Sequence, residues 1–355
     1  MTDAHLTRFF SASQQGPRPL PLFLELLRSE TAASPDRRAA ALAGLAAYQS
    51  ARRPAPRAPK PAIARAGRAT LRDYGGRGRP VVFVPSLINP PMVLDLARGN
   101  SLLRWLARQG VRPMLVDWGV PDRDARDEDV TAHVERLLLP LLAALDRPPV
   151  LVGYCLGGTM ALAAAAASEA AGLVTIAAPW HFSGYGRALD SISALWDQAQ
   201  PTCEALGLVP MEVLQAGFWQ LDPARTIAKF ERFGRLPPRS AEANSFVALE
   251  DWANGGAPLA YAAGRQLFDD LLSADLPGQG RWQVAGQLVR PEALACPTLA
   301  FVSTTDRIVP AASAPRLAES TALSVGHVGM IVGGRARGLV WQPLADWLTA
   351  LPRTR

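Results

Sequence analysis

The chain has 355 residues, of which 49% are hydrophobic and 19% are charged. This composition predicts a globular protein with a sizeable core and excludes an intrinsically disordered chain. The first residues lack a basic region followed by an apolar run, so we expect no secretory signal and a cytoplasmic protein. Three cysteines are too few for a disulfide framework, and no cluster of ligand side chains has the spacing of a metal site.

The formal net charge of +6 is carried almost wholly by arginine. A basic surface attracts anions such as nucleic acid, phosphate-bearing cofactors or anionic membranes, but an arginine-biased genome explains the charge without a partner. No nucleic-acid-binding signature is present, so we predict no nucleic-acid partner. The longest apolar stretch, residues 160–178, contains Ser168 and Glu169. A buried helix followed by a strand explains it, and we predict no transmembrane segment.

Residues 1–67 are predicted to form an N-terminal helical segment followed by a linker. Apolar periodicity predicts helices over Leu20–Ser29 and Ala32–Tyr48. The stretch Ala51–Ala66 is rich in proline and arginine, which indicates an extended spacer with little core. We interpret it as a solvated linker, with contact to an anionic surface as the alternative.

From residue 80 onward, short apolar runs alternate with helical patterns, which predicts an α/β fold with a mostly parallel sheet. The predicted strands are Val81–Pro85, Met114–Asp117, Val150–Tyr154, Leu173–Ala177, Thr298–Ser303 and Ala322–Val325. The predicted helices of this region are 101–110, 130–145, one that follows residue 155, and 339–349. His133, in a polar helical stretch, is expected at the surface.

The β/α alternation is interrupted between two of the predicted strands. Residues 181–295 contain helical patterns and many aromatic side chains but no obvious central strand. We therefore predict a cap or lid inserted into the core, which divides the core into residues 68–180 and 296–355.

Residues 150–159 read Val-Leu-Val-Gly-Tyr-Cys-Leu-Gly-Gly-Thr, an apolar run followed by a sharp, glycine-flanked turn. This pattern predicts a nucleophile elbow, the strained strand-to-helix turn at the top of an α/β-hydrolase sheet. Glycines beside Cys155 are expected because backbone and helix approach too closely there for Cβ atoms. A thiol at the position that serine usually occupies indicates an acyl-enzyme held as a thioester. An inert buried thiol is the alternative.

Two further groups follow in the order nucleophile, acid, histidine that α/β-hydrolases use. Asp306 comes just after a predicted strand, and His327 lies in a glycine-flanked loop before the last helix. A thiol needs a base to become a thiolate, and the base needs a group that orients it. We therefore predict a catalytic triad of Cys155, His327 and Asp306. The alternatives are a turn or cap role for Asp306 and a structural role for His327.

Other residues are expected close to the triad. We predict an oxyanion hole formed by the backbone N–H of Leu156 and that of Ser86 or Leu87, because the residue before Ser86 is a proline without an N–H. Tyr154 and His181 are predicted to line the substrate site. For His181 a purely structural role is the alternative.

Several ordered motifs lie within residues 80–350: PSLINPPMVLDL at 85–96, NSLLRWL at 100–106, VDWGVPD at 116–122, GYCLGGT at 153–159, DRIVP at 306–310 and GHVG at 326–329. Together they resemble the motifs of polyhydroxyalkanoate synthases. In that family a cysteine attacks the thioester of an (R)-3-hydroxyacyl-CoA, a histidine activates the thiol, and an aspartate assists the 3-hydroxyl group of an acyl unit. The resemblance implies these roles for Cys155, His327 and Asp306, with a CoA thioester as substrate and no cofactor.

The resemblance also implies partners. The segment DWANG at 251–255 is similar to a Trp- and Asn-containing segment of the family, which implies that Trp252 and Asn254 line the substrate site; a plain loop is the alternative. Association with a polyester granule is implied as well. The chain is close in length to the short synthases that need a second subunit, whereas its GYCLGGT motif is closer to the long ones. A second synthase subunit and a homodimer therefore both stay open.

We predict an acyltransferase of the polyhydroxyalkanoate synthase type, which polymerises (R)-3-hydroxyacyl-CoA through a cysteine thioester and releases CoA. One alternative is a thioesterase, esterase or polyester depolymerase that uses the same triad on water. Another is a non-catalytic scaffold that binds granules or a partner synthase. No residue pattern fixes the chain length of the monomer.

Overall fold

The computed structural model describes residues 16–53 and 57–352, and these fall into two compact units. A helical unit combines the N-terminal helices with residues 211–256, and a sheet-containing unit holds residues 58–210 and the chain from 257 onward. This division differs from the predicted single cap over 181–295. Residues 181–210 and 257–295 group with the sheet, whereas 211–256 group with the N-terminal helices.

The sheet-containing unit is built on eight strands in the order β1-β2-β4-β3-β5-β6-β11-β12. The strands are β1 (Ala62–Ala66), β2 (Ala69–Asp73), β3 (Pro80–Val84), β4 (Arg112–Asp117), β5 (Val150–Tyr154), β6 (Gly172–Ile176), β11 (Thr298–Ser303) and β12 (Glu319–Leu323). β2 pairs antiparallel with β1 and β4, and the other neighbours pair in parallel. The predicted α/β-hydrolase fold with a mostly parallel sheet is confirmed.

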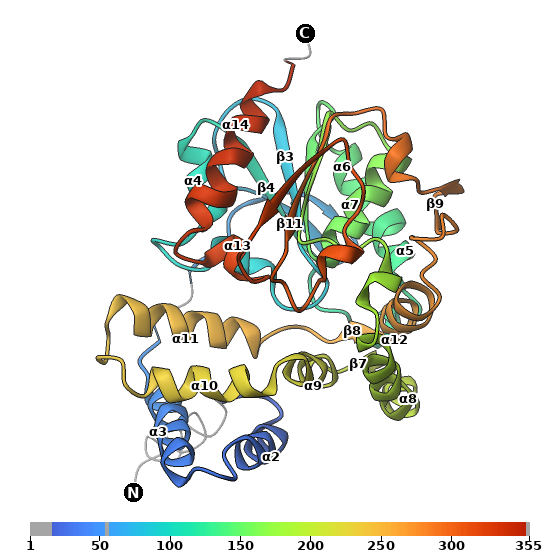
Figure 1. The fold of residues 1–355 in the computed structure, drawn as a ribbon. Helices are drawn as coiled ribbons and strands as arrows, with labels where there is room; N and C mark the ends of the chain where they lie inside the picture. The colour runs from blue at the N-terminus through green and yellow to red at the C-terminus, as the bar shows by residue number, and fades with distance from the viewer. Residues whose placement is uncertain (1–15, 54–56, 353–355) are drawn as a thin grey trace, which may run out of the picture. The chain divides into compact units, whose positions relative to one another are not determined.

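Helices cover both faces of this sheet (Figure 1). One face carries η1 (Pro91–Asp95), α4 (Leu102–Arg108), α13 (Gly329–Val332), η8 (Arg337–Trp341) and α14 (Gln342–Ala350). The other carries α5 (Val130–Ala132), η3 (His133–Leu138), α6 (Leu139–Ala143) and α7 (Leu156–Ala167). Because parallel strands are covered on both faces, they read as continuous apolar runs. β3, β5 and β6 are buried along their whole length.

The first strand of the sheet lies where the sequence predicts a spacer. The prediction over Ala51–Ala66 is wrong at its C-terminal end, because Ala62–Ala66 forms β1. β1 is an edge strand that is mostly exposed, and it pairs with β2 alone. An edge strand with an exposed face needs few apolar side chains, so its alanines and arginine leave no strand pattern in the sequence.

His133 is buried, with 3% of its surface exposed, so its predicted place at the surface is wrong. Its Nδ1 lies 2.6 Å from the carbonyl oxygen of Asp129, and its Nε2 lies 2.7 Å from a guanidinium nitrogen of Arg68. Burial lowers the pKa of His133. A neutral ring that donates from Nδ1 and accepts at Nε2 satisfies both contacts. Arg68 lies on the β1–β2 turn, too distant in sequence to be recognised as a partner.

The insertion between β6 and β11 contributes further elements to the sheet-containing unit. Before residue 211 these are η4 (Phe182–Tyr185), α8 (Ala188–Leu206) and β7 (Leu208–Val209). After residue 256 they are β8 (Leu259–Ala260), α12 (Tyr261–Arg265), η5 (Gln266–Ser273), β9 (Gln283–Val284), β10 (Gln287–Leu288) and η6 (Pro291–Ala293). Two short 3-10 helices, η2 (Arg123–Ala125) and η7 (Ala311–Ser313), lie in the loops of the core. β7 pairs antiparallel with β8, which brings the two arms of the insertion together.

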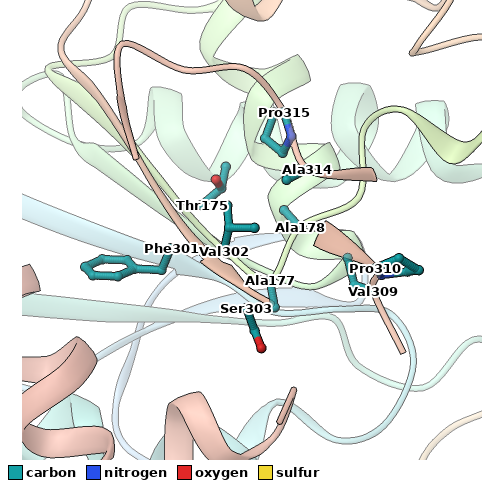
Figure 2. Close-up of a pocket in the computed structure, with 10 residues that line it drawn as sticks. All are labelled: Thr175, Ala177, Ala178, Phe301, Val302, Ser303, Val309, Pro310, Ala314 and Pro315. Atoms are coloured by element: carbon teal, nitrogen blue, oxygen red, sulfur yellow. The ribbon is translucent and has the colours of Figure 1, made fainter. Parts of the chain in front are cut away.

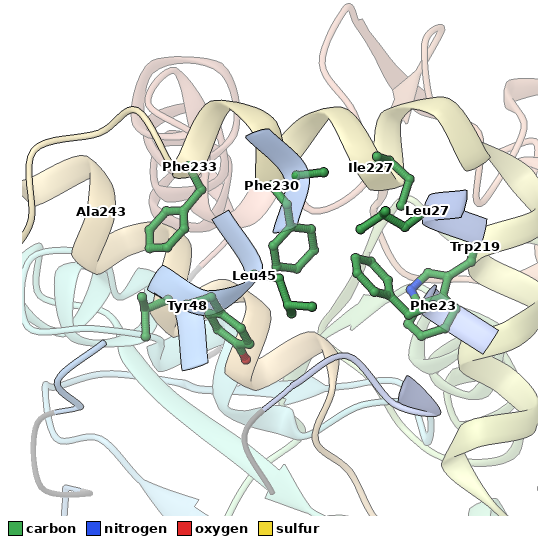
Figure 3. Packing of buried hydrophobic residues seen from close by; sticks show 11 residues of the cluster. Phe23, Leu27, Leu45, Tyr48, Trp219, Ile227, Phe230, Phe233 and Ala243 are labelled. Carbon is green, nitrogen blue, oxygen red and sulfur yellow. The ribbon is translucent and has the colours of Figure 1, made fainter. Parts of the chain in front are cut away.

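The helical unit has a core of its own. It contains α2 (Leu20–Glu30), α3 (Pro35–Ser50), α9 (Met211–Leu221), α10 (Pro223–Phe233) and α11 (Ala241–Ala253). Figure 3 shows aromatic side chains of the N-terminal helices pointing into the same cluster as those of α9 and α10. The ring of Phe230 lies 5.0 Å from that of Phe23 and 5.9 Å from that of Tyr48, both edge-to-face. These contacts explain why residues 211–256 group with the N-terminal helices.

A glycine sets the distance between α3 and α10. A Cβ atom at Gly44 would lie 1.9 Å from the carbonyl oxygen of Phe230, a backbone atom that cannot turn aside. We predict that Gly44→Ala destabilises the helical unit by about 1–3 kcal/mol. Hydrogen exchange of the α3 and α10 amides, measured on the full chain, should quicken while exchange in β5 stays unchanged. Gly99→Ala is the matched control, because no atom lies within 4 Å of its Cβ position. Unchanged exchange in α3 would contradict the prediction.

Candidate active site

Cys155 lies on a tight turn between β5 and α7. Its φ of 56° and ψ of −134° lie in a region that residues other than glycine rarely adopt. A Cβ at Gly157 would lie 2.1 Å from the carbonyl oxygen of Val84, and one at Gly158 would lie 2.2 Å from the Cβ of Ala178. Glycine is therefore required on the helix side of Cys155, because the elbow packs directly against the ends of β3 and β6.

Asp306 follows β11 in a loop that fixes its carboxylate. One oxygen accepts hydrogen bonds from the backbone N–H groups of Ile308 (2.8 Å) and Val309 (3.1 Å). The other accepts a hydrogen bond from His327 Nδ1 at 2.7 Å. Asp306 and His327 are both buried. The loop thus orients the acid, and the acid in turn fixes the imidazole ring.

His327 interacts with both of the other predicted triad residues. Because Nδ1 is bonded to Asp306, Nε2 is the nitrogen left for the thiol of Cys155. Burial lowers the pKa of His327, but the charges of Cys155 and Asp306 and their hydrogen bonds outweigh burial and raise the pKa to about 10. A positively charged His327 beside a thiolate is the arrangement that activates a cysteine for nucleophilic attack.

The charge of Cys155 is the largest influence that raises the pKa of His327. We therefore predict that Cys155→Ala lowers this pKa, whereas Cys296→Ala leaves it unchanged. Both can be measured by NMR titration of labelled histidine, with His327→Gln identifying the signal. The raised pKa also stabilises the fold: its contribution is full below the ordinary value of 6.5 and is lost as the pH rises toward 10. An unchanged His327 pKa in Cys155→Ala would contradict the proposed pairing.

Two tyrosines lie close to these three residues. The ring of Tyr154 lies 5.1 Å from the ring of His327, and its buried hydroxyl has no hydrogen-bond partner in the part of the chain that the structure describes. Burial, followed by the charges of Cys155 and Asp306, raises the pKa of both Tyr154 and Tyr185. Tyr185, in η4, was not among the predicted site residues. No motif surrounds it, and its only sequence signal is its place soon after the β6 strand.

The predicted oxyanion-hole residues lie around the elbow. Leu156 is the first residue of α7, where the N–H has no partner inside the helix. Pro85, directly before Ser86, approaches the position of a Gly157 Cβ to 2.5 Å, so the loop after β3 borders the elbow. None of the backbone hydrogen bonds between described residues uses the N–H of Ser86 or Leu87. Their role in stabilising an oxyanion stays a prediction.

The loop after β6 carries the predicted substrate-lining residue His181. The backbone N–H groups of Trp180 and His181 both donate to the carbonyl oxygen of Ser313, at 2.6 and 3.0 Å. Ser313 lies in η7, on the same loop as Asp306. The side chain of His181 lines a cavity of about 300 Å³ whose wall contains none of the predicted triad residues.

A much smaller cavity lies between the ends of β6 and β11 (Figure 2). Ala177 and Ala178 line one part of it, and Ser303 at the end of β11 lines another together with Val309 and Pro310 of the Asp306 loop. Its volume of about 10 Å³ is that of roughly one water molecule. It cannot hold an acyl chain, and we interpret it as a packing gap beneath the loop.

Trp252 and Asn254 belong to the helical unit. Asn254 accepts a hydrogen bond from the backbone N–H of Arg18 (3.2 Å) and donates one to the carbonyl oxygen of Glu250 (2.8 Å). The neighbouring Asp251 accepts from the hydroxyl of Tyr48 at 2.6 Å. This segment therefore ties α11 to the N-terminal helices, and a substrate-lining role for Trp252 and Asn254 stays a prediction.

Neither a metal-binding cluster nor a membrane-spanning helix is found within the described residues 16–53 and 57–352. No group of three or more histidine, cysteine, aspartate or glutamate side chains is placed to hold a metal ion there. No helix within the same ranges is both long enough and apolar enough to cross a membrane.

Comparison with known proteins decides the family. The profile of the alpha/beta hydrolase family matches residues 81–336, which is most of the chain. The chain belongs to this family. Cys155, Asp306 and His327 follow one another in the chain order nucleophile, acid, histidine of this fold, and their catalytic roles stay a prediction.

Curated relatives narrow the resemblance within the alpha/beta hydrolases. The poly(3-hydroxyalkanoate) polymerase subunit PhaC of Haloferax mediterranei is 28% identical over 296 residues, which cover 78% of this chain and 59% of that protein. The subunit of the same name from Allochromatium vinosum is 26% identical over 288 residues, or 76% of this chain and 80% of that protein. The chain thus spans about three fifths of the Haloferax relative. The predicted resemblance to polyhydroxyalkanoate synthases is confirmed.

Among solved structures, an epoxide hydrolase from Bacillus megaterium superposes with a TM-score of 0.53. Its sequence is 13% identical, and the match covers 81% of this chain and all of that one. At this identity the likeness concerns the fold alone.

Proposed function

We propose that this protein is an acyltransferase that polymerises (R)-3-hydroxyacyl-CoA through a thioester on Cys155. The single observation that carries the proposal is the Cys155, His327 and Asp306 cluster at the elbow of an alpha/beta hydrolase fold. The similarity to poly(3-hydroxyalkanoate) polymerase subunits supports the choice of a hydroxyacyl-CoA as donor. A thiol nucleophile suits a thioester substrate, since exchange between two thioesters is close to balanced in energy.

The geometry of the cluster supports the proposed first half-reaction. The Cys155 thiolate attacks the carbonyl carbon of the acyl-CoA, and the N–H groups of Leu156 and of Ser86 or Leu87 stabilise the developing oxyanion. The bond between this carbon and the CoA sulfur then breaks. The departing thiolate receives the proton of His327 Nε2, so CoA leaves as a thiol and the acyl group stays on Cys155. His327 is now neutral and ready to act as a base.

The second half-reaction extends the polymer. The 3-hydroxyl of an acyl unit attacks a thioester carbonyl, a new ester C–O bond forms, and the C–S bond breaks. Neutral His327, assisted by Asp306, accepts the proton of the hydroxyl at Nε2 as this ester forms. The sulfur of Cys155 leaves as a thiolate, which restores the starting pair of thiolate and charged His327. Water at the same position would release a free acid instead, so exclusion of water decides between polymer and hydrolysis.

Incubation with 3-hydroxybutyryl-CoA tests the proposed function. Free CoA and the fate of the acyl group are both followed, with the chain alone and with a second synthase subunit added. The proposal predicts CoA release with formation of insoluble polyester. Free 3-hydroxy acid without polymer under both conditions would instead identify a thioesterase or another hydrolase.

We also propose two kinds of association. The relatives are named as subunits of a polymerase, which supports a second synthase subunit as partner; a homodimer is the alternative. A polyester product is insoluble, so an enzyme that extends it works at the surface of a cytoplasmic granule. In a strain that carries Cys155→Ala, loss of the phenotype that depends on this protein indicates a synthase or a hydrolase. A non-catalytic scaffold would keep that phenotype.

A further inference from the structure

The sheet-containing unit holds a cavity of about 300 Å³ in the loops that follow β6 and β11. We call it the arginine pocket, because Arg290 and Arg316 both line it. Trp180, His181 and Glu292 also line it. None of these residues belongs to the proposed triad. The arginine pocket is thus a separate feature that the chemistry at Cys155 leaves unexplained.

The two arginines of the pocket differ from three other arginines of the sheet-containing unit. Arg72, Arg104 and Arg112 each form an ion pair with an aspartate, at 2.9 to 3.0 Å. Neither Arg290 nor Arg316 has an ion pair or a side-chain hydrogen bond with any other described residue. An unpaired guanidinium beside a cavity offers a planar fork of N–H donors that matches the oxygens of a phosphate group.

The wall around Trp180 and His181 is held by backbone contacts. Both residues donate to the carbonyl oxygen of Ser313, and the indole ring of Trp180 lies 6.1 Å from that of Trp282. Ser313 follows Asp306 and precedes Arg316 on one loop. This loop therefore carries a residue of the proposed triad at one end and a residue of the arginine pocket at the other.

Asp275, which is buried and has a positive φ of 46°, joins the segment after His181 to the lining residue Gly278. Its carboxylate accepts hydrogen bonds from the backbone N–H of Phe182 (2.8 Å) and of Gly278 (3.1 Å). A Cβ at Gly278 would lie 2.4 Å from that carboxylate, so the turn closes only with glycine. The cavity thus has a rigid wall, as expected of a preformed binding site.

We propose that the arginine pocket binds the phosphate groups of coenzyme A. The choice of coenzyme rests on the proposed function, whereas the phosphate chemistry rests on the pocket alone. Arg290 and Arg316, which are both exposed, would bind phosphate oxygens of the coenzyme. Glu292 is the one acidic side chain of the lining, and it repels a phosphate at the same place.

Removing positive charge and removing negative charge from the pocket should have opposite effects on the affinity for CoA. Relative to the unsubstituted chain, Arg290→Gln/Arg316→Gln should weaken CoA binding at least tenfold, which corresponds to about 1.4 kcal/mol. Glu292→Gln should tighten it. The matched control is Arg108→Gln/Arg136→Gln, which removes two exposed arginines outside the pocket. Calorimetric titration of the full chain with CoA gives these affinities, and inorganic phosphate and adenosine 3′,5′-bisphosphate are titrated in parallel.

The titrations separate the outcomes. Arginine-dependent binding that is tighter for CoA and the bisphosphate than for inorganic phosphate supports the proposal. If all three ligands bind equally tightly and their binding depends on the two arginines, the pocket is a site for free phosphate. This result would overturn its assignment to coenzyme A. Equal CoA affinity in the pocket variant and the control overturns the site. Because CoA binding is measured without turnover, and should persist in Cys155→Ala, a failure of polymer synthesis leaves this test intact.

Discussion

Replacement of Cys155 by alanine is expected to abolish acyl transfer, with a loss on the order of 10⁴-fold or more in CoA release. The thiolate supplies the bond that holds the acyl group, and no other group at the elbow can replace it. The matched variants are Cys203→Ala and Cys296→Ala, which remove the other two cysteines of the chain and should keep most of the activity. Initial rates of CoA release from 3-hydroxybutyryl-CoA provide the measurement.

Cys155→Ser is the informative intermediate. Serine keeps nearly the same volume on the strained turn, so the elbow should keep its geometry. A hydroxyl is far harder to ionise than a thiol, and a His327 tuned to pair with a thiolate cannot make up the difference. We expect most of the activity to be lost. Wild-type rates in either Cys155 variant would show that the acyl group is transferred by another route.

Removal of His327 is expected to be the second largest loss. His327→Ala leaves no base or acid at Nε2, and general acid–base catalysis accounts for on the order of 10² to 10⁴-fold in rate. Asp306→Asn tests the orienting role of Asp306. A neutral amide lacks the negative charge that holds the Nδ1–H group of His327, and it permits the wrong tautomer of the ring. In both variants kcat should fall by a larger factor than the factor by which KM rises.

The pH dependence of the activity distinguishes a catalytic role of His327 from a structural one. If His327 is held as a cation beside the Cys155 thiolate, activity should fall as the pH rises through about 10, where His327 loses its proton. His327→Ala should lack this alkaline limb. His133→Gln is the matched histidine variant, and activity per folded molecule should keep the wild-type pH profile. An unaltered alkaline limb in His327→Ala would contradict the assignment.

The sequence predicts the strands that are buried on both faces, because apolar runs such as Val81–Val84 and Val150–Tyr154 have no other place in a folded chain. It also predicts which residues meet at the site, because the alpha/beta hydrolase fold delivers nucleophile, acid and histidine in a fixed chain order. The 2.7 Å contact between Asp306 and His327 joins two residues that the sequence predicts from this order and from their places in loops after predicted strands. Order along the chain carries the information here, not local propensity.

What the sequence does not predict depends on partners distant along the chain. The apolar faces of α9 and α10 indicate burial, but they do not say that Phe23 and Tyr48 of the N-terminal helices cover them. His133 lies in a polar stretch, and its burial follows from contacts with Arg68 and Asp129. Tyr185 has no motif, and only the path of the loop after β6 brings it near Cys155 and Asp306.

The central claim is that Cys155 carries the acyl group as a thioester. Brief reaction with 3-hydroxybutyryl-CoA, acid quenching and mass spectrometry of the intact chain and its peptides test it directly. The chain is expected to become heavier by one hydroxyacyl unit or more, with the added mass on the peptide that contains Cys155 and removed by hydroxylamine. Acyl mass on Cys203, on Cys296 or on no cysteine at all, while CoA is being released, would contradict it.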